Sequence, residues 1–202
     1  MPSDLTLAAT ARSRTTRQRL ALLPITYGDG SHGMAIVNNF LEGLDFGDHV
    51  DAPRCDAVAM HLMEIAADGV IGGPDIGVWM AAKHDVPLFH SVAAALRRGG
   101  SELDVDGVVI IGEHGSWPED QRARFLYPRR EIFDQVVGVF RQAGRSVPVF
   151  NEKELSWNWA WAKHMWAQVQ ELDVPFMAGG CRGRHSIHQS RSRTATSSTT
   201  WS

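Results

Sequence analysis

Three side chains in this sequence are of the types that bind a divalent metal ion. His32 follows the first apolar run of the chain, and Glu113-His114 follows the most continuous one, GVVIIG at 107–112. Two imidazoles and one carboxylate suit Zn²⁺ or a similar ion and leave coordination positions open for water. A metal-bound water becomes a nucleophile near neutral pH. The sequence therefore predicts a metal centre at His32, Glu113 and His114, with structural hydrogen bonding as the alternative role.

Three further residues are predicted to be catalytic: Tyr127, Arg129 and Lys153. Tyr127-Pro128-Arg129-Arg130 precedes a helical pattern, and arginines at a helix start oppose the helix dipole. That cost favours a function, such as bidentate binding of an anionic substrate group. Lys153 follows another short apolar run and is suited to act as an acid or an electrostatic stabiliser. The alternative is a solvated helix start and an exposed loop lysine.

A glycine-rich loop follows the first apolar run and reads GxGxxG at Gly28, Gly30 and Gly33. Such a loop can hold a pyrophosphate at the start of a helix, so these glycines are the predicted cofactor-binding residues for NAD(P). An acidic residue is expected about 20 residues beyond the glycines, and Glu64 lies well past that spacing. The alternative is a glycine-rich turn that contains the bulky His32.

Apolar runs rich in β-formers alternate with helical patterns along the chain. Strands are expected at 20–26, 57–62, 87–89, 107–112, 147–150 and 174–177. Helices are expected at 34–44, 75–84, 91–98, 129–144 and 154–172, with Asp75 and Ser91 as N-caps and Gly144 as a stop. This alternation predicts an α/β fold, a Rossmann-like doubly wound parallel sheet in three α/β/α layers. Ligands of such folds bind outside the carboxyl ends of the strands.

Composition limits the classes of protein and of partner. The 202 residues are 44% hydrophobic and carry a net charge of −3, which fits one domain and gives no reason to expect nucleic acid or a membrane as partner. The two cysteines form no CxxC pair, so we expect a cytoplasmic protein without a disulfide framework. The domain is expected at 19–178, between a disordered leader at 1–18 and a polar, disordered tail at 179–202 that we take to be a non-native extension.

Two other features have structural and functional interpretations. Tryptophans recur at helical spacing in the last expected helix, notably Trp157 and Trp161. Aromatic platforms can bind sugars, but helix-spaced tryptophans are more typical of a core or a subunit interface, so we expect a homo-oligomer. His61 ends the second expected strand and is a weaker candidate for the site, since it alternates with apolar Met60 and Leu62.

Several segments, taken together in their order and spacing, resemble a known family of enzymes. They are the glycine loop at 28–33, AAKHDVPLFHSVAAAL, DVDGVVIIGEH, and VPVFNEKELS, in which Glu152 and Lys153 match a Glu-Lys-Pro motif and Glu154 replaces its proline. Over residues 19–178 the chain resembles the N-terminal Rossmann domain of the Gfo/Idh/MocA-family oxidoreductases, which implies NAD(P) binding. That family carries a second, substrate-binding domain after this one, and here we expect the polar tail in its place.

The chain also resembles an uncharacterised bacterial group of stand-alone domains. The shared signatures are S-H at Ser31-His32, E-H-G at 113–115, Y-P-R-R at 127–130 and N-x-K-x-L-S at 151–156. Because we expect no second domain while the polar cluster is present, we expect a metal-dependent hydrolase or lyase acting on a small anionic or sugar-like substrate. The alternatives are an NAD(P)-binding oxidoreductase domain and a non-catalytic ligand-binding oligomer.

Overall fold

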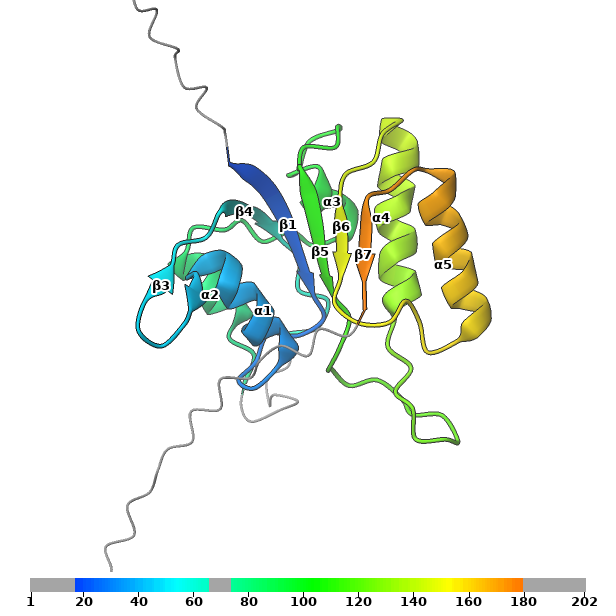
Figure 1. The fold of residues 1–202 in the computed structure, drawn as a ribbon, viewed down its shortest axis with the longest axis horizontal. Helices are drawn as coiled ribbons and strands as arrows, with labels where there is room; N and C mark the ends of the chain where they lie inside the picture. The colour runs from blue at the N-terminus through cyan, green and yellow to red at the C-terminus, as the bar shows by residue number, and fades with distance from the viewer. Residues whose placement is uncertain (1–16, 66–73, 180–202) are drawn as a thin grey trace, which may run out of the picture.

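A parallel β-sheet forms the centre of the molecule in the computed structural model, which describes residues 17–65 and 74–179. Its five strands lie in the order β4-β1-β5-β6-β7, and every pair in it is parallel (Figure 1). The strands are β1 (Gln18–Pro24), β4 (Cys55–Met60), β5 (Gly107–Ile111), β6 (Val149–Asn151) and β7 (Phe176–Ala178). From β1 the chain winds first to β4 and then back across β1 to β5. The predicted Rossmann-like, doubly wound sheet is therefore confirmed.

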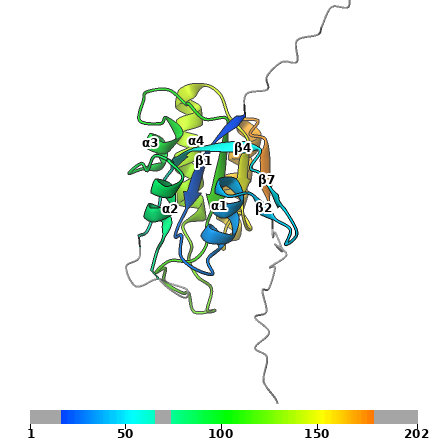
Figure 2. The same cartoon turned by 90° about the vertical axis from the view of Figure 1, so that its left-hand side faces the viewer.

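Helices cover both faces of this sheet and make three layers (Figures 1 and 2). The helices are α1 (His32–Leu41), α2 (Gly77–Lys83), α3 (Val92–Leu96), α4 (Arg129–Ala143) and α5 (Trp159–Glu171). One buried cluster joins α1 and α2 to Leu22 and Val109 on one face of the sheet. The other joins α3, α4 and α5 to Leu23 and Ile110, which alternate with the first pair along the same strands. Both faces of the central strands are thus buried, as their continuous apolar sequences indicate.

The carboxyl ends of β1, β5 and β6 lie at one level, because their registers pair Pro24 with Ile111 and Ile110 with Asn151. The chain leaves all three strands at the lower edge of the sheet in Figure 1. The switch between the two winding directions lies between β1 and β5. The loops after these strands therefore lie together at the position where open α/β folds bind their ligands, and we call this position the crevice.

A two-stranded antiparallel hairpin, β2 (Leu44–Asp45) and β3 (Val50–Asp51), follows α1 and was not predicted. The helix ends at Leu41 and not at 44, since Gly43 adopts φ +104° and packs against the backbone of Asp51. A Cβ at Gly43 would lie 2.3 Å from the Asp51 carbonyl oxygen. The hairpin depends on a glycine that periodicity alone does not distinguish from a helical residue.

The last helix, α5, begins at Trp159, whereas the sequence pattern predicted a start at 154. Asn158 is its N-cap, and the Asn158 side chain accepts a hydrogen bond from the Trp161 amide. The chain turns just after β6 instead, because the side-chain amide of Asn151 donates to the carbonyl oxygens of Lys153 and Glu154. The residues expected to open the helix therefore belong to the loop that carries charged groups at the sheet edge.

Other expectations differ from the structure in detail. The segment expected as a strand at 87–89 forms only a single parallel bridge, between Leu88 and Met60, the last residue of β4. Ser91 caps α3 as predicted, whereas Asp75 lies one position before the N-cap of α2 and accepts the amides of both Gly77 and Tyr27. The predicted leader and tail fall almost wholly on residues 1–16 and 180–202, outside the described part of the chain.

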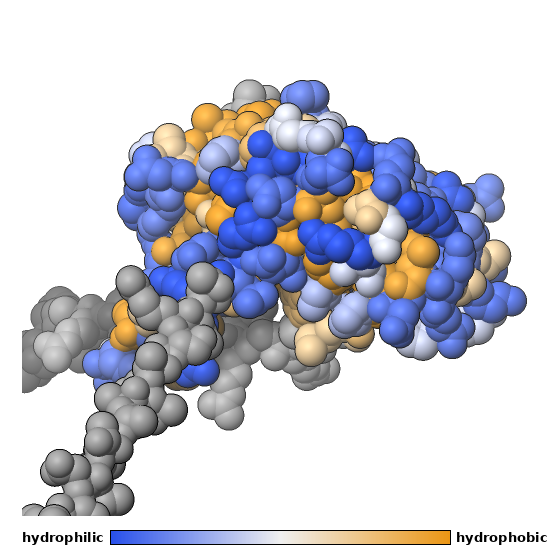
Figure 3. Space-filling view, turned by 90° about the horizontal axis from the view of Figure 1, so that it is seen from above, coloured by the Kyte–Doolittle hydropathy of each residue, from blue (hydrophilic) through white to orange (hydrophobic). Residues whose placement is uncertain are grey.

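The opposite, amino-terminal edge of the sheet is covered mainly by polar side chains, with apolar patches between them (Figure 3). Arg19 at the start of β1 forms ion pairs with Asp104 and Asp106 there. Within residues 17–65 and 74–179, no helix combines the length and apolar character needed to cross a bilayer.

Gly33 fixes how closely α1 approaches the end of β1. A Cβ at Gly33 would lie 2.1 Å from the carbonyl oxygen of Thr26, which is backbone and cannot move aside. We predict that Gly33→Ala lowers the free energy of unfolding by about 2–3 kcal/mol, measured by urea denaturation. Gly138→Ala in α4 is the matched control: its Cβ meets nothing within 4 Å, so stability should rise by about 1 kcal/mol. Equal effects of the two substitutions would contradict this packing.

Candidate functional site

Glu113, two residues beyond β5, is the centre of a charged cluster in the crevice. Its Oε2 atom lies 2.8 Å from His32 Nδ1 and 2.7 Å from Lys153 Nζ, and its Oε1 atom lies 3.2 Å from the Arg129 guanidinium. The three partners come from the start of α1, the loop after β6 and the start of α4. One carboxylate thus joins the segments that follow β1, β5 and β6.

His32 is held by two carboxylates through the same nitrogen. Besides Glu113, its Nδ1 atom lies 2.5 Å from Oε1 of Glu152, whose side chain is only 1% exposed. An ionised carboxylate accepts hydrogen bonds and donates none, so the hydrogen of the imidazole resides on Nδ1. The Nε2 atom is therefore the hydrogen-bond acceptor of the ring when His32 is neutral.

Lys153 lies between the same two carboxylates, 2.7 Å from Glu113 and 3.2 Å from Glu152. Burial alone would lower the pKa of Lys153, but its hydrogen bond to Glu113 and the charge of Glu152 outweigh burial and raise the pKa above the usual value. The raised pKa keeps the ammonium group protonated. Lys153 is thus an electrostatic stabiliser or a proton donor, and a poor proton acceptor.

His114 packs edge-on against His32, with ring centroids 4.9 Å apart. Burial, together with the nearby His32, lowers the pKa of His114, so this imidazole is neutral near pH 7. Its Nε2 atom is buried and has no hydrogen-bond partner among the described residues. His114 adopts φ +66°, a left-handed conformation that is costly for a residue with a Cβ.

The turn that carries His114 is held from the loop after β4. The Glu64 carboxylate accepts the Ser116 amide at 2.9 Å, and a Cβ on Gly115 would lie 2.5 Å from the same carboxylate. Gly115 also adopts φ +95°. The E-H-G signature is thus a turn that needs its glycine and that Glu64 fixes in place.

Arg129 is predicted to bind an anionic substrate, but the structure buries it. Its side chain is 2% exposed and pairs with Glu113 and, at 2.5 Å, with Glu154, while its guanidinium lies over the ring of Tyr127. A Cβ on Gly112 would lie 2.6 Å from the Arg129 side chain, so the end of β5 must be a glycine there. Arg129 stabilises the cluster and does not present its charge to solvent. Burial also raises the pKa of Tyr127, which stays protonated.

The glycine loop has the backbone features of a phosphate-binding turn. Ser31 caps α1 by accepting the Met34 amide, so the first-turn amides of His32 and Gly33 have no acceptor within the helix. Gly30 is exposed and adopts φ +70°. Gly28 is buried, and it pairs with Asp75 in an antiparallel bridge. The free amides and the close approach of Gly33 fit a pyrophosphate group.

The other predicted residues are placed as follows. The Nδ1 atom of His61 lies 2.8 Å from the carbonyl oxygen of Phe89, so His61 holds the bridged segment outside β4 and does not join the cluster. Trp157 and Trp161 pack edge-on, and Arg130 lies over Trp161. Trp159 and Trp166 are exposed.

Sequence reasoning did not assign Glu152, Glu154 and Glu64 to the site. Glu152 and Glu154 flank Lys153 directly after a buried strand, and that alternation of charge was a usable signal. Nothing in the sequence pairs Glu64 with Ser116, because the contact joins loops 52 residues apart.

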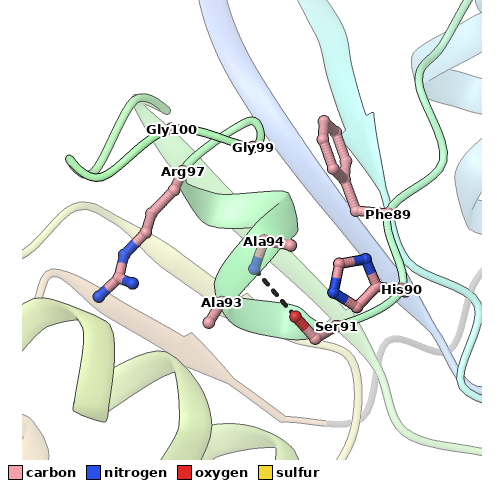
Figure 4. Close-up of a pocket in the computed structure, with 8 residues that line it drawn as sticks. All are labelled: Phe89, His90, Ser91, Ala93, Ala94, Arg97, Gly99 and Gly100. Carbon is pink, nitrogen blue, oxygen red and sulfur yellow. Dashed lines mark hydrogen bonds between the residues drawn. The ribbon is translucent and has the colours of Figure 1, made fainter.

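A cavity of about 300 Å³ lies beside α3, apart from the cluster (Figure 4). Phe89, His90, Ser91 and Arg97 line it, together with small residues of the same segment. The Ser91 hydroxyl points to the Ala94 amide and caps the helix. None of the predicted site residues borders this cavity.

No protein-family model and no curated protein matches this chain. Solved structures do match it. GenD2 from gentamicin A biosynthesis, crystallised with NAD, has a TM-score of 0.51 at 17% identity, over 86% of this chain and 37% of that chain. Myo-inositol 2-dehydrogenase from Lactobacillus plantarum has a TM-score of 0.50 at 16% identity, over 81% and 36%. Scyllo-inositol dehydrogenase from Lactobacillus casei also has a TM-score of 0.50, at 14% identity and the same coverage.

These neighbours are dehydrogenases of the Gfo/Idh/MocA type, so the resemblance to the N-terminal Rossmann domain of that family is confirmed as a likeness of fold. The chain spans a little over one third of their length, 36–37%.

The prediction of a metal-dependent hydrolase is wrong, because these neighbours are NAD-type dehydrogenases. The ligand atoms of His32, Glu113 and His114 do lie within 4.8 Å of one another. However, both oxygens of Glu113 already accept from cations, and His32 Nδ1 is bound to carboxylates. The cluster is an ion-pair network in which Arg129 and Lys153 balance the charge of Glu113.

Arg129 should be required for stability because its removal leaves Glu113 with one cation fewer in a largely buried setting. We predict that Arg129→Met lowers the free energy of unfolding by about 2–3 kcal/mol. Arg124→Met is the matched control: Arg124 is 46% exposed and pairs with Asp120 at the surface, so we expect a loss of about 0.5 kcal/mol or less. Chemical denaturation of both variants measures the difference. An Arg129→Met variant with an unchanged free energy of unfolding would show that the ion-pair network does not stabilise the sheet edge.

Proposed function

We propose that this chain is the NAD(P)-binding domain of an oxidoreductase, with the dinucleotide lying across the carboxyl edge of β4, β1 and β5. The observation that carries the proposal is the glycine loop at the switch point of the sheet. Gly33 lets α1 begin directly against Thr26, and the free amides of His32 and Gly33 offer donors for a pyrophosphate. The neighbouring fold of GenD2, whose structure holds NAD, supports the same assignment.

The polar cluster lies beside that loop and is suited to the substrate end of the site. A bound nicotinamide supplies or accepts a hydride. Lys153, which stays protonated, can donate a hydrogen bond to a substrate oxygen, while Arg129 and Tyr127 support the cluster from the side of α4. We no longer expect Arg129 to bind an anionic substrate, since Glu113 and Glu154 neutralise it.

The ribose end of the dinucleotide lacks the usual acidic partner among the described residues. Glu64 follows β4, but its carboxylate is committed to Ser116, and His61 stands at the strand end. The proposal therefore extends to NADH and NADPH alike.

Binding of NADH and NADPH tests the proposal directly. We expect one of them to bind at micromolar concentration, measured by isothermal titration calorimetry. Gly30→Val should weaken binding by about tenfold or more, because a side chain would separate the pyrophosphate from the backbone. Gly47→Val is the matched control, since Gly47 is also exposed and adopts φ +89° but lies in the β2–β3 hairpin. Absence of binding of both dinucleotides at millimolar concentration would refute the assignment.

We further propose that the chain forms a homo-oligomer through α5. Trp159 is 76% exposed and Trp166 is 48% exposed, an unusual area of aromatic surface for a free helix. Light scattering at micromolar concentration should report a dimer or larger species, and Trp159→Glu should shift the population toward monomer. A monomeric wild-type chain would contradict this proposal.

A further inference from the structure

A buried carboxylate, that of Glu152, determines which ring nitrogen of His32 in the crevice can accept a proton. His32 Nδ1 lies 2.5 Å from Oε1 of Glu152, and Glu152 is 1% exposed. The other oxygen of Glu152 is buried and has no partner among residues 17–65 and 74–179. All hydrogen bonding of this carboxylate is therefore directed through one oxygen to His32 and Lys153. A base oriented by a second, buried group is the arrangement found in enzymes that move protons.

The other polar groups of the crevice are poorer proton acceptors. Lys153 and Tyr127 have raised pKa values and keep their protons. His114 is neutral, but its Nε2 atom is buried. Glu113 is neutralised by Arg129 and Lys153. His32 remains, with a side chain that is 24% exposed and an Nε2 atom for which the described part of the chain offers no hydrogen-bond partner.

We propose that His32 Nε2 is the proton acceptor for the alcohol that this domain oxidises, and that Glu152 is the residue that positions it. The inference rests on the proposed NAD(P)-dependent function. It places the acid–base group on the dinucleotide-binding domain itself, at the first residue of α1.

The step balances with oxidised nicotinamide as the oxidant. The carbinol C–H bond breaks, and its electron pair leaves with the hydrogen as hydride to the nicotinamide ring. The O–H bond breaks, its proton passes to His32 Nε2, and its electrons form the second bond of the carbonyl group. The alcohol is oxidised, the nicotinamide is reduced, and Glu152 balances the charge of the imidazolium that forms.

The experiment has a spectroscopic part that needs no substrate. In protein labelled with ¹⁵N-histidine, long-range ¹H–¹⁵N spectra at pH 8.5 report which imidazole nitrogen carries the hydrogen. We expect His32 to be the Nδ1–H tautomer in the wild type and in Glu154→Gln, the matched control, since Glu154 is 60% exposed and contacts Arg129. In Glu152→Gln we expect a mixture of tautomers. His32 with its hydrogen on Nε2, or on both nitrogens, in the wild type would overturn the proposal.

The second part measures how reactive Nε2 is. Diethyl pyrocarbonate acylates unprotonated imidazole, and mass spectrometry gives the rate at each histidine. We expect His32 to react at least as fast as His90, which is more exposed, and Glu152→Gln to slow it by about tenfold, the factor that a charge-assisted hydrogen bond controls. An unchanged rate in Glu152→Gln would show that Glu152 has only a structural role.

Addition of NADH separates the two proposals. If the dinucleotide binds and His32 lies at its reactive end, saturating NADH should protect His32 and leave the acylation of His90 unchanged. Binding of NADH without protection of His32 would remove His32 from the reaction while the proposed function stands. If NADH does not bind, NADPH takes its place in the same experiment; the expected tautomer without binding of either dinucleotide would mean that the proposed function has failed.

Discussion

The shared carboxylate of Glu113 is the interaction on which the arrangement of this crevice depends. It accepts hydrogen bonds from His32, Lys153 and Arg129. His32 begins α1 after β1, Lys153 lies in the loop after β6, and Arg129 is the first residue of α4. Parallel strands that end at one level bring these segments together, and the carboxylate then holds them in one geometry. A charge taken from water costs several kcal/mol unless it is paired, so removing one member leaves the others unfavourably placed.

That constraint explains several backbone features nearby. Gly112 is a glycine because the stem of Arg129 occupies the position of its Cβ. His114 and Gly115 adopt left-handed conformations in the turn that follows Glu113, and Glu64 fixes this turn through the Ser116 amide. The local strain is supported by contacts from another loop, as is common where side chains are held for binding or chemistry.

The sequence predicted the layers of the fold and the edge of the sheet at which the site lies, because alternating apolar runs and the positions of strand ends are local signals. GVVIIG reads as a buried strand, and Gly144 ends α4 with φ +63°, both as expected. The β2–β3 hairpin and the late start of α5 were missed, since they depend on the packing of Gly43 and on the hydrogen bonds of the Asn151 side chain. The hydrolase interpretation was wrong, because the neighbouring folds belong to dehydrogenases. Residue types predicted that His32, Glu113 and His114 lie together, and their ligand atoms do lie within 4.8 Å of one another. The ion pairs of Glu113 with Arg129 and Lys153 join distant segments, so the sequence did not reveal them.

The central claim is that the glycine loop holds a dinucleotide whose reactive end faces the cluster. A crystal structure of the protein grown with NAD⁺ or NADP⁺ tests it most directly. The account predicts a pyrophosphate at the amides of His32 and Gly33 and a nicotinamide ring within contact distance of the His32 imidazole, which remains bound to Glu152. A dinucleotide bound elsewhere, or a crevice in which the ion pairs of Glu113 exclude it at saturating concentration, would contradict the account.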